Sequence, residues 1–175
     1  MCCLLLTACG TKPTITSGAT PTASAAETMQ TTVITEPVAT AETAEPQEVF
    51  LTVYSPDENL AKFEKTEVLV EAITESAIIK QLTLAGVLTD GIQVNSFALV
   101  ASSETSDTVQ LQIDFNDAFR DLILTQGSAG EHAIIGSVVN TFLTAYNAQN
   151  MVISVEGELL ESGHFVYDMP LEFYN

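Results

Sequence analysis

Residues 128–142 have the sequence SAGEHAIIGSVVNTF, and this stretch decides the fold. Its large apolar residues recur every three or four positions, a spacing that is typical of an α-helix. Ser128 and Glu131 have the spacing of a capping box, in which each side chain accepts a hydrogen bond from a free backbone N–H. The pattern predicts an amphipathic helix from Ser128 to about Asn147, buried through Ile134, Ile135, Val138, Val139, Phe142 and Tyr146.

Strand patterns lie on both sides of this helix. Residues 151–156 place an apolar side chain at every second position, and Gly157 follows as a turn. Before the helix, residues 93–101 and 108–115 are two further strands, separated by the polar segment Ser102–Asp107. We expect them to form an antiparallel hairpin, with one face of the second strand buried through Val109, Leu111 and Ile113. A short helical turn through Phe119 and Leu122 then leads to the helix.

The N-terminal part of the domain predicts a strand followed by a helix. Residues 48–55 alternate as a strand does. Thr66 is expected to cap a helix over residues 67–85, because acidic residues follow it in the first turn. Gly86 would end that helix. Its buried side would carry Leu69, Ala72, Ile73 and Ala77.

The order of elements indicates the fold class. Residues 163–173 add a short final strand, so the order is β-α-β-β-α-β with a β tail. Such an order predicts an α+β domain in which two helices pack on one side of a small mixed sheet. We expect this domain to occupy residues 48–175.

Residues 1–9 resemble the end of a bacterial lipoprotein signal. The segment Leu6-Thr7-Ala8-Cys9 is similar to a lipobox, whose cysteine is diacylated and becomes the new N-terminus. A signal sequence normally opens with a basic residue and has a longer apolar stretch, so we expect the true start to lie upstream. The alternative is a cytosolic protein whose Cys9 is fortuitous.

Residues 10–47 predict a tether. They are rich in Thr, Ala, Pro and Glu and have few large apolar side chains, so they cannot bury enough surface to offset chain entropy. Such a segment would hold the domain away from a membrane. With Cys9 as the lipidated residue, it predicts a lipid-anchored protein on the extracytoplasmic face of the cell membrane.

The charge of the chain excludes nucleic acid as a partner. The sequence has 23 acidic and 5 basic residues, a formal net charge of −18. Contacts with a phosphate backbone need Lys or Arg, which are scarce here. The acidic surface is most simply explained by solubility, and a basic partner or loosely bound divalent cations are the alternatives.

No residue pattern predicts catalysis, a metal site or a cofactor. The three cysteines all precede Gly10, and His132 and His164 lie too far apart in the sequence for a short metal-ligand motif. Counted from Asp114, an EF-hand loop would need Gly and Glu where Phe119 and Thr125 stand. His132 is expected to be solvated, and His164 to fix a loop by a hydrogen bond.

Several segments within residues 48–173 together follow the pattern of a known family. They are Val53–Asp57, Leu111–Phe115, Val138–Phe142, Val152–Glu158, and Gly163-His164 with Asp168, Pro170 and Leu171. In this order they resemble the GerMN domain of sporulation and spore-germination lipoproteins. The resemblance implies a fold of the ring-building type and a non-catalytic assembly role, with no catalytic residues to transfer. At the matched helix, Asn140 and Thr141 are expected to cap or to pair with a neighbouring strand.

We therefore expect a non-enzymatic scaffold that binds envelope or spore-channel proteins in sporulation, germination or envelope assembly, as a homo- or hetero-oligomer. Two alternatives remain open at this point. One is an extracytoplasmic module that binds a glycan or a divalent cation, and the other is a wall hydrolase with an unrecognised carboxylate pair.

Overall fold

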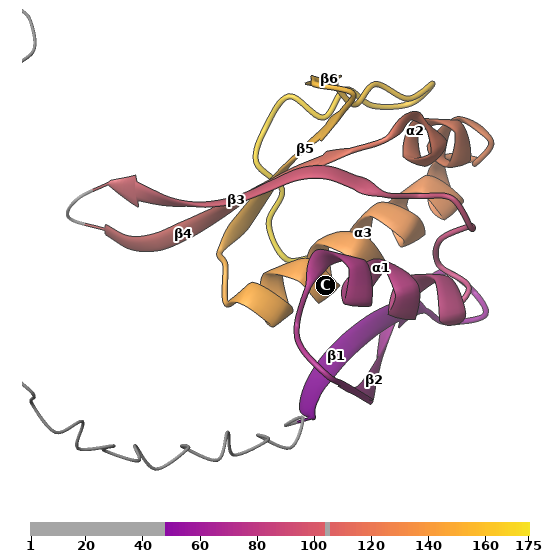
Figure 1. Cartoon of the computed structure of the whole chain (residues 1–175). Helices are drawn as coiled ribbons and strands as arrows, with labels where there is room; N and C mark the ends of the chain where they lie inside the picture. The colour runs from indigo at the N-terminus through magenta and orange to yellow at the C-terminus, as the bar shows by residue number, and fades with distance from the viewer. Residues whose placement is uncertain (1–47, 104–105) are drawn as a thin grey trace, which may run out of the picture. The chain divides into compact units, whose positions relative to one another are not determined.

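The computed structural model describes residues 48–103 and 106–175 (Figure 1). The predicted lipobox with Cys9 and the predicted tether lie outside these residues. The elements, in chain order, are β1 (Val49–Pro56), β2 (Phe63–Val70), α1 (Glu75–Leu84), β3 (Val94–Ser103), β4 (Ser106–Phe115), α2 (Asp117–Leu124), α3 (Ser128–Tyr146), β5 (Asn150–Val155) and β6 (Glu158–Leu159).

The strands form two sheets. β1 and β2 are an antiparallel hairpin, and the other four strands form a sheet in the order β3-β4-β5-β6. β4 runs antiparallel to β3 and parallel to β5, so this sheet is mixed. Leu111 and Ile113 of β4 lie beside Met151 and Ile153 of β5, and all four are buried. The α+β class, the mixed sheet and the β3–β4 hairpin are therefore confirmed.

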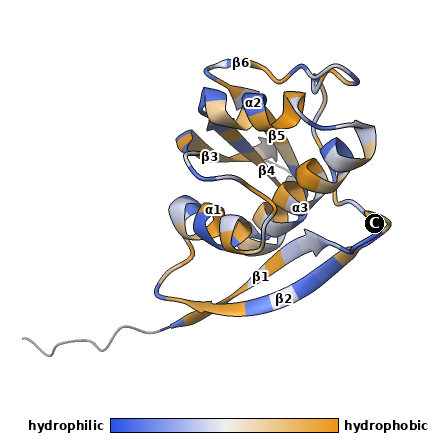
Figure 2. Ribbon diagram, turned by 90° about the vertical axis from the view of Figure 1, so that its right-hand side faces the viewer, coloured by the Kyte–Doolittle hydropathy of each residue, from blue (hydrophilic) through white to orange (hydrophobic). Residues whose placement is uncertain are grey.

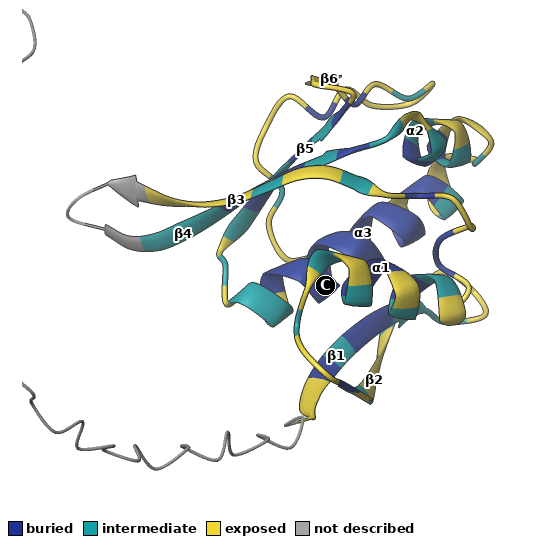
Figure 3. Cartoon of the chain, viewed as in Figure 1, coloured by how far each residue is buried: buried dark blue, intermediate teal, exposed yellow. Residues whose placement is uncertain are grey.

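Helix α3 runs through the centre of the domain, between the β1–β2 hairpin and the four-stranded sheet (Figure 2). Every residue from Ala133 to Leu143 is buried, polar ones included (Figure 3). The predicted helix is present, but its predicted amphipathic character is wrong because both of its sides are covered. Gly136 allows close packing, since a Cβ there would come within 2.3 Å of the Phe63 ring of β2.

The predicted helix over residues 67–85 is wrong in its first half. Residues 63–70 form β2, where Thr66 lies opposite Val53 of β1, and Leu69 is exposed. α1 begins only at Glu75, and the Thr74 side chain accepts a hydrogen bond from the Ala77 N–H. Its end is as predicted, because Gly86 adopts the left-handed conformation with φ +76°.

Two further predictions need correction. The structure has three helices in its described part rather than two on one side of one sheet, because α2 precedes α3 and β1 pairs with β2 instead of joining the larger sheet. Residues 163–173 form no strand. β6 is the strand after the Gly157 turn, and the tail is held by isolated bridges, Met151 with Leu171 and Glu161 with Val166.

Candidate functional site

Glu131 is the most unusual side chain of the core, because it is an acidic residue and is fully buried. One carboxylate oxygen accepts a hydrogen bond of 2.6 Å from the Tyr167 hydroxyl. The other lies 3.0 Å from Nδ1 of His164. The predicted capping box is therefore wrong: Gly127 is the N-cap residue, and the Glu131 side chain points to the C-terminal loop instead of the first turn.

This buried group holds the loop after β6 against α3. Burial raises the pKa of Tyr167 strongly, and the adjacent Glu131 carboxylate raises it further through its hydrogen bond and charge. Both carboxylate oxygens of Glu131 therefore have hydrogen-bond partners within the fold. The expectation that His164 fixes a loop is confirmed, and His132 is exposed as predicted.

Asn140 and Thr141 tie α3 to two distant parts of the chain. The Asn140 side chain donates to the Tyr174 carbonyl and accepts from the Tyr174 N–H, both at 2.8 Å. The Thr141 hydroxyl accepts from the Tyr54 N–H in β1 at 3.0 Å and donates to the Ser137 carbonyl. Their expected pairing with a neighbouring strand is confirmed for Thr141, while Asn140 pairs with the C-terminal tail.

Asp114 also acts within the fold. Its Oδ1 accepts from the Ser154 hydroxyl and the Gly157 N–H, and Oδ2 accepts from the Asn95 amide. Burial raises the pKa of Asp114, but these three hydrogen bonds outweigh it and leave the pKa below 3.8. Among the described residues, no three His, Cys, Asp or Glu side chains are placed to hold a metal ion.

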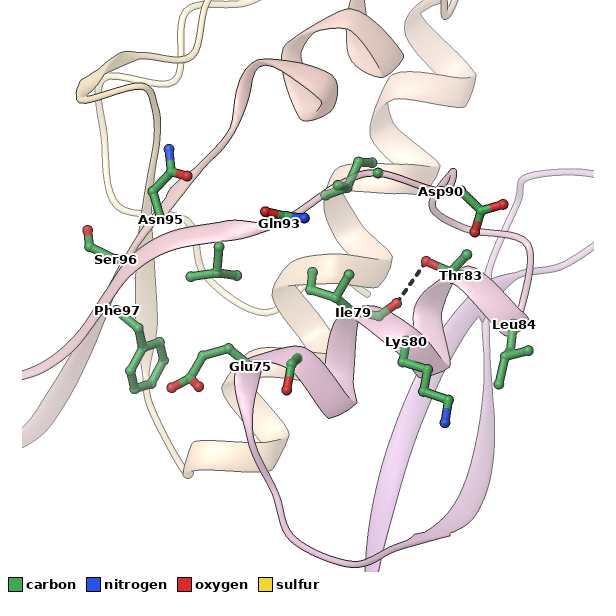
Figure 4. Close-up of a pocket in the computed structure, with 14 residues that line it drawn as sticks. Glu75, Ile79, Lys80, Thr83, Leu84, Asp90, Gln93, Asn95, Ser96 and Phe97 are labelled. Carbon is green, nitrogen blue, oxygen red and sulfur yellow. Dashed lines mark hydrogen bonds between the residues drawn. The ribbon is translucent and has the colours of Figure 1, made fainter.

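A groove of about 800 Å³ lies between α1 and the first half of β3 (Figure 4). Ile79, Ile92 and Val94 provide apolar surface, and Glu75, Lys80 and Asp90 provide charge. The other residues that line it are Ser76, Thr83, Leu84, Gly91, Gln93, Asn95, Ser96 and Phe97.

Phe97 lines the groove and packs against α3. The Phe97 ring lies 4.6 Å from the Tyr146 ring of α3, measured between centroids. Burial raises the pKa of Tyr146 to about 12, and the charge and hydrogen bonding of Glu75 add to the effect. The neutral hydroxyl is therefore held beside the Glu75 carboxylate, which orients both groups at the mouth of the groove.

The other wall of the groove is β3, at the edge of the sheet that the described strands form. β3 is the outermost strand, and none of its ten residues is charged. Of residues 96–101, all except the half-buried Phe97 are exposed, including Leu99 and Val100 (Figure 3). An exposed strand edge offers unpaired N–H and C=O groups to another chain. We call the groove together with this strand the α1–β3 edge.

A smaller cavity of about 280 Å³ lies beside the C-terminal loop. It is lined by His132, Phe165, Val166, Tyr167, Asp168, Met169, Leu171 and Tyr174. No sequence pattern pointed to either hollow, because each is made by segments that meet only in the folded chain. For the α1–β3 edge the usable signal was the absence of charge from residues 94–103 in so acidic a chain.

Comparison with solved structures finds four similar chains, and three of them are described here. The tandem GerMN domains of the sporulation protein GerM from Bacillus subtilis match with 18% identity and a TM-score of 0.49, over 76% of this chain and 50% of that one. The chain thus spans half the length of that structure. The first GerMN domain of the same protein matches with 16% identity and a TM-score of 0.46, over 73% and 98%.

The third structure is of a candidate lipoprotein from Clostridium perfringens, with 17% identity, a TM-score of 0.41, and coverage of 71% of this chain and 87% of that one. No curated protein matches the chain. Within the described residues, no helix is both long and apolar enough to span a membrane. A family model named Germane, described as sporulation and spore germination, matches residues 41–161. Because this family model matches more than half of the residues of the chain, the chain belongs to the Germane family of sporulation and spore germination.

Proposed function

We propose that this protein is a lipid-anchored scaffold on the extracytoplasmic face of the membrane, where it binds other envelope or spore-channel proteins without catalysing a reaction. The observation that carries the proposal is the α1–β3 edge. An uncharged outer strand lies beside an open groove there, and this combination suits protein association by strand addition.

The chemistry of the polar groups supports a non-catalytic role. Glu131, the fully buried carboxylate, has both oxygens engaged by the C-terminal loop. Asp114 is likewise engaged by three donors of the fold. A general acid or base must reach a substrate proton, and neither group is free to do so.

The anchor rests on the sequence of residues 6–9. Acylation of Cys9 would place the domain outside the membrane at the end of residues 10–47. We expect Cys9→Ser, expressed from its own gene, to move the protein from the membrane fraction to the medium. Retention of this variant in the membrane would contradict acylation at Cys9.

Photo-crosslinking in the intact envelope tests the scaffold. A photoreactive amino acid replaces Leu99 on the α1–β3 edge, and in a matched control it replaces Leu124 of α2. The two leucines are similarly exposed, at 48% and 54%. We expect crosslinked proteins from position 99 that are absent from position 124.

Equal crosslinking from both positions would contradict a dedicated surface. A digest of cell-wall fragments provides the second arm of the test. If the purified full chain released products, and if substitution of one carboxylate abolished that release, the protein would be a hydrolase and the proposal would be overturned.

A further inference from the structure

The edge of β3 lacks the charged and proline residues that often protect an outer strand. Natural sheets protect their edges with Lys, Pro, inward charges, β-bulges or a covering segment. The register of β3 against β4 shifts on either side of residues 96–101, and between these two shifts the strand is regular. β2, at the edge of the smaller sheet, carries Glu64, Lys65 and Glu67, and β6 carries Glu158. β3 has neither charge nor proline over its ten residues, and no described strand lies beside its second edge.

The charge of the domain favours a second copy as the occupant. Residues 48–175 contain 19 acidic and 4 basic residues, a net charge of −15. Two copies repel wherever their acidic surfaces meet, and an uncharged strand is where they approach at the lowest cost. A basic partner would bind more favourably to the acidic surface outside β3 than to β3 itself. The absence of charge on β3 therefore points to a partner that is acidic, as this chain is.

The two halves of β3 complement each other. The first half borders the groove, which is lined by the half-buried side chains of Val94 and Phe97. The second half extends beyond the helices as part of the β3–β4 hairpin (Figure 1). Leu99 and Val100 there are exposed. Antiparallel pairing of two copies lays the exposed half of each strand along the groove half of the other.

Symmetry restricts the register of this pairing. Opposite residues of an antiparallel pair lie on the same face of the sheet, and a two-fold axis normal to the sheet preserves the faces. The axis must therefore lie midway between the two copies of one residue, which is then opposite itself. An axis at Ala98, near the middle of β3, sets Leu99 opposite Phe97 of the second copy. Both side chains lie on the core side, because their β4 partners Leu111 and Ile113 are buried.

We propose that two copies of this chain associate through β3, antiparallel about a two-fold axis at Ala98, with Leu99 of each copy packed in the α1–β3 groove of the other. This inference rests on the proposed scaffold function, and it names a second copy of the chain as one partner of the α1–β3 edge. Anchoring both copies to one membrane would favour a weak dimer by raising its effective concentration.

Sedimentation equilibrium of the full chain provides the first test. Cys2→Ser, Cys3→Ser and Cys9→Ser are introduced to remove the lipid site and the native thiols. We expect a dimer whose fraction rises with protein concentration between about 1 and 100 µM, as for a small interface. Leu99→Lys should weaken dimerisation at least tenfold, although it lowers the net negative charge. Leu124→Lys on α2 is the matched control and should change nothing.

A monomer at all concentrations, or a dimer insensitive to Leu99→Lys in a variant whose circular dichroism is native, would overturn the inference. The register has its own test in the same cysteine-free background. Ala98→Cys lies opposite itself across the axis, at a Cα separation of about 5 Å that suits a disulfide. Val100→Cys lies opposite Ser96, so its two copies are about 14 Å apart.

Mild oxidation should therefore give a covalent dimer with Ala98→Cys and none with Val100→Cys. Equal dimer yields from the two variants would overturn the register and with it the proposal. Photo-crosslinks from Leu99 to other proteins, without any to a second copy, would overturn the dimer and leave the scaffold function standing. The failures of the two proposals are thus distinguishable.

Discussion

The C-terminal side of the domain and the α1–β3 edge differ in which groups they bury. Polar side chains are buried and hydrogen-bonded on the C-terminal side, whereas apolar side chains are exposed at the α1–β3 edge. On the C-terminal side, α3 buries Glu131, Asn140 and Thr141, and each has partners from a distant segment. At the α1–β3 edge, a strand without charge leaves Leu99 and Val100 exposed beside an open groove. The first region satisfies its polar groups by hydrogen bonds within the fold, whereas the second leaves apolar side chains exposed.

This difference helps to distinguish a group that stabilises the fold from a surface that is a candidate for binding. A buried polar group is costly unless it is hydrogen-bonded, so a residue such as Glu131 is easily mistaken for part of an active site. Its partners show that it fixes a loop. An uncharged outer strand attracts less attention in a sequence, although it carries the surface that a partner can use.

The largest effect is expected from a charge placed in α3. Val139 is fully buried, and Val139→Asp would bury an unpaired carboxylate at a cost of several kcal/mol, comparable to the whole stability of a small domain. We expect the domain to unfold, with loss of helical circular dichroism. Val166→Asp, at an exposed position, is the control. A native spectrum for Val139→Asp would contradict the central position of α3.

Removal of the buried carboxylate should have the next largest effect. Glu131→Ala leaves the Tyr167 hydroxyl without its acceptor and opens space beside it, which should cost about 2–4 kcal/mol of unfolding free energy. Urea denaturation measures this cost against Glu158→Ala, an exposed control. If the two variants were equally stable, Glu131 would not be the tie between α3 and the loop.

Asn140→Ala should destabilise less. It removes two hydrogen bonds to the main chain of Tyr174, which lies at the partly exposed end of the chain, so we expect a loss of about 1–2 kcal/mol. Asn59→Ala, at an exposed turn, should leave the urea midpoint unchanged. A similar urea midpoint for both variants would mean that the contact between Asn140 and the C-terminal tail does not stabilise the domain.

A pH dependence should appear at the groove. The pKa of Tyr146 is raised from 10.0 to about 12, so the folded state favours the neutral hydroxyl. The stability from this preference is complete below pH 10 and is lost as the pH rises from 10 to about 12. Tyr146→Phe should therefore reduce the loss of unfolding free energy over that range. An unchanged pH profile would contradict the burial of this hydroxyl.

The smallest effect on stability is expected at the free edge itself. Leu99→Lys changes an exposed side chain, so the unfolding free energy of the monomer should shift by less than about 0.5 kcal/mol. Thermal denaturation at low protein concentration measures this. A large loss of unfolding free energy would mean that Leu99 stabilises the β3–β4 hairpin. The contrast between the C-terminal side and the α1–β3 edge would then fail.

The sequence predicted those helices and strands that are buried on one face or on all sides. Apolar periodicity identified β4, β5 and α3, because their large side chains repeat at strand or helix spacing. It missed β2, where Lys65, Thr66 and Glu67 imitate a helix start. Most of that strand is exposed on both faces, so no apolar alternation marks it.

The candidate site was beyond prediction for a different reason. The groove needs α1 and β3 to be side by side, and the predicted helix began in what is β2. The partners of Glu131 come from a loop more than 30 residues later, which no local pattern can identify. Within the described residues, the Ser137 hydroxyl is the only buried polar side-chain atom without a partner, so α3 is otherwise fully satisfied.

Hydrogen exchange at two protein concentrations tests the contrast between the two sides most directly. The unlipidated full chain is labelled at low and at high concentration, and amide exchange is compared for residues 94–101 and 163–171. We predict that raising the concentration slows exchange in residues 94–101 and leaves residues 163–171 unchanged. Exchange that slows in residues 163–171 and stays constant along β3 would contradict the account.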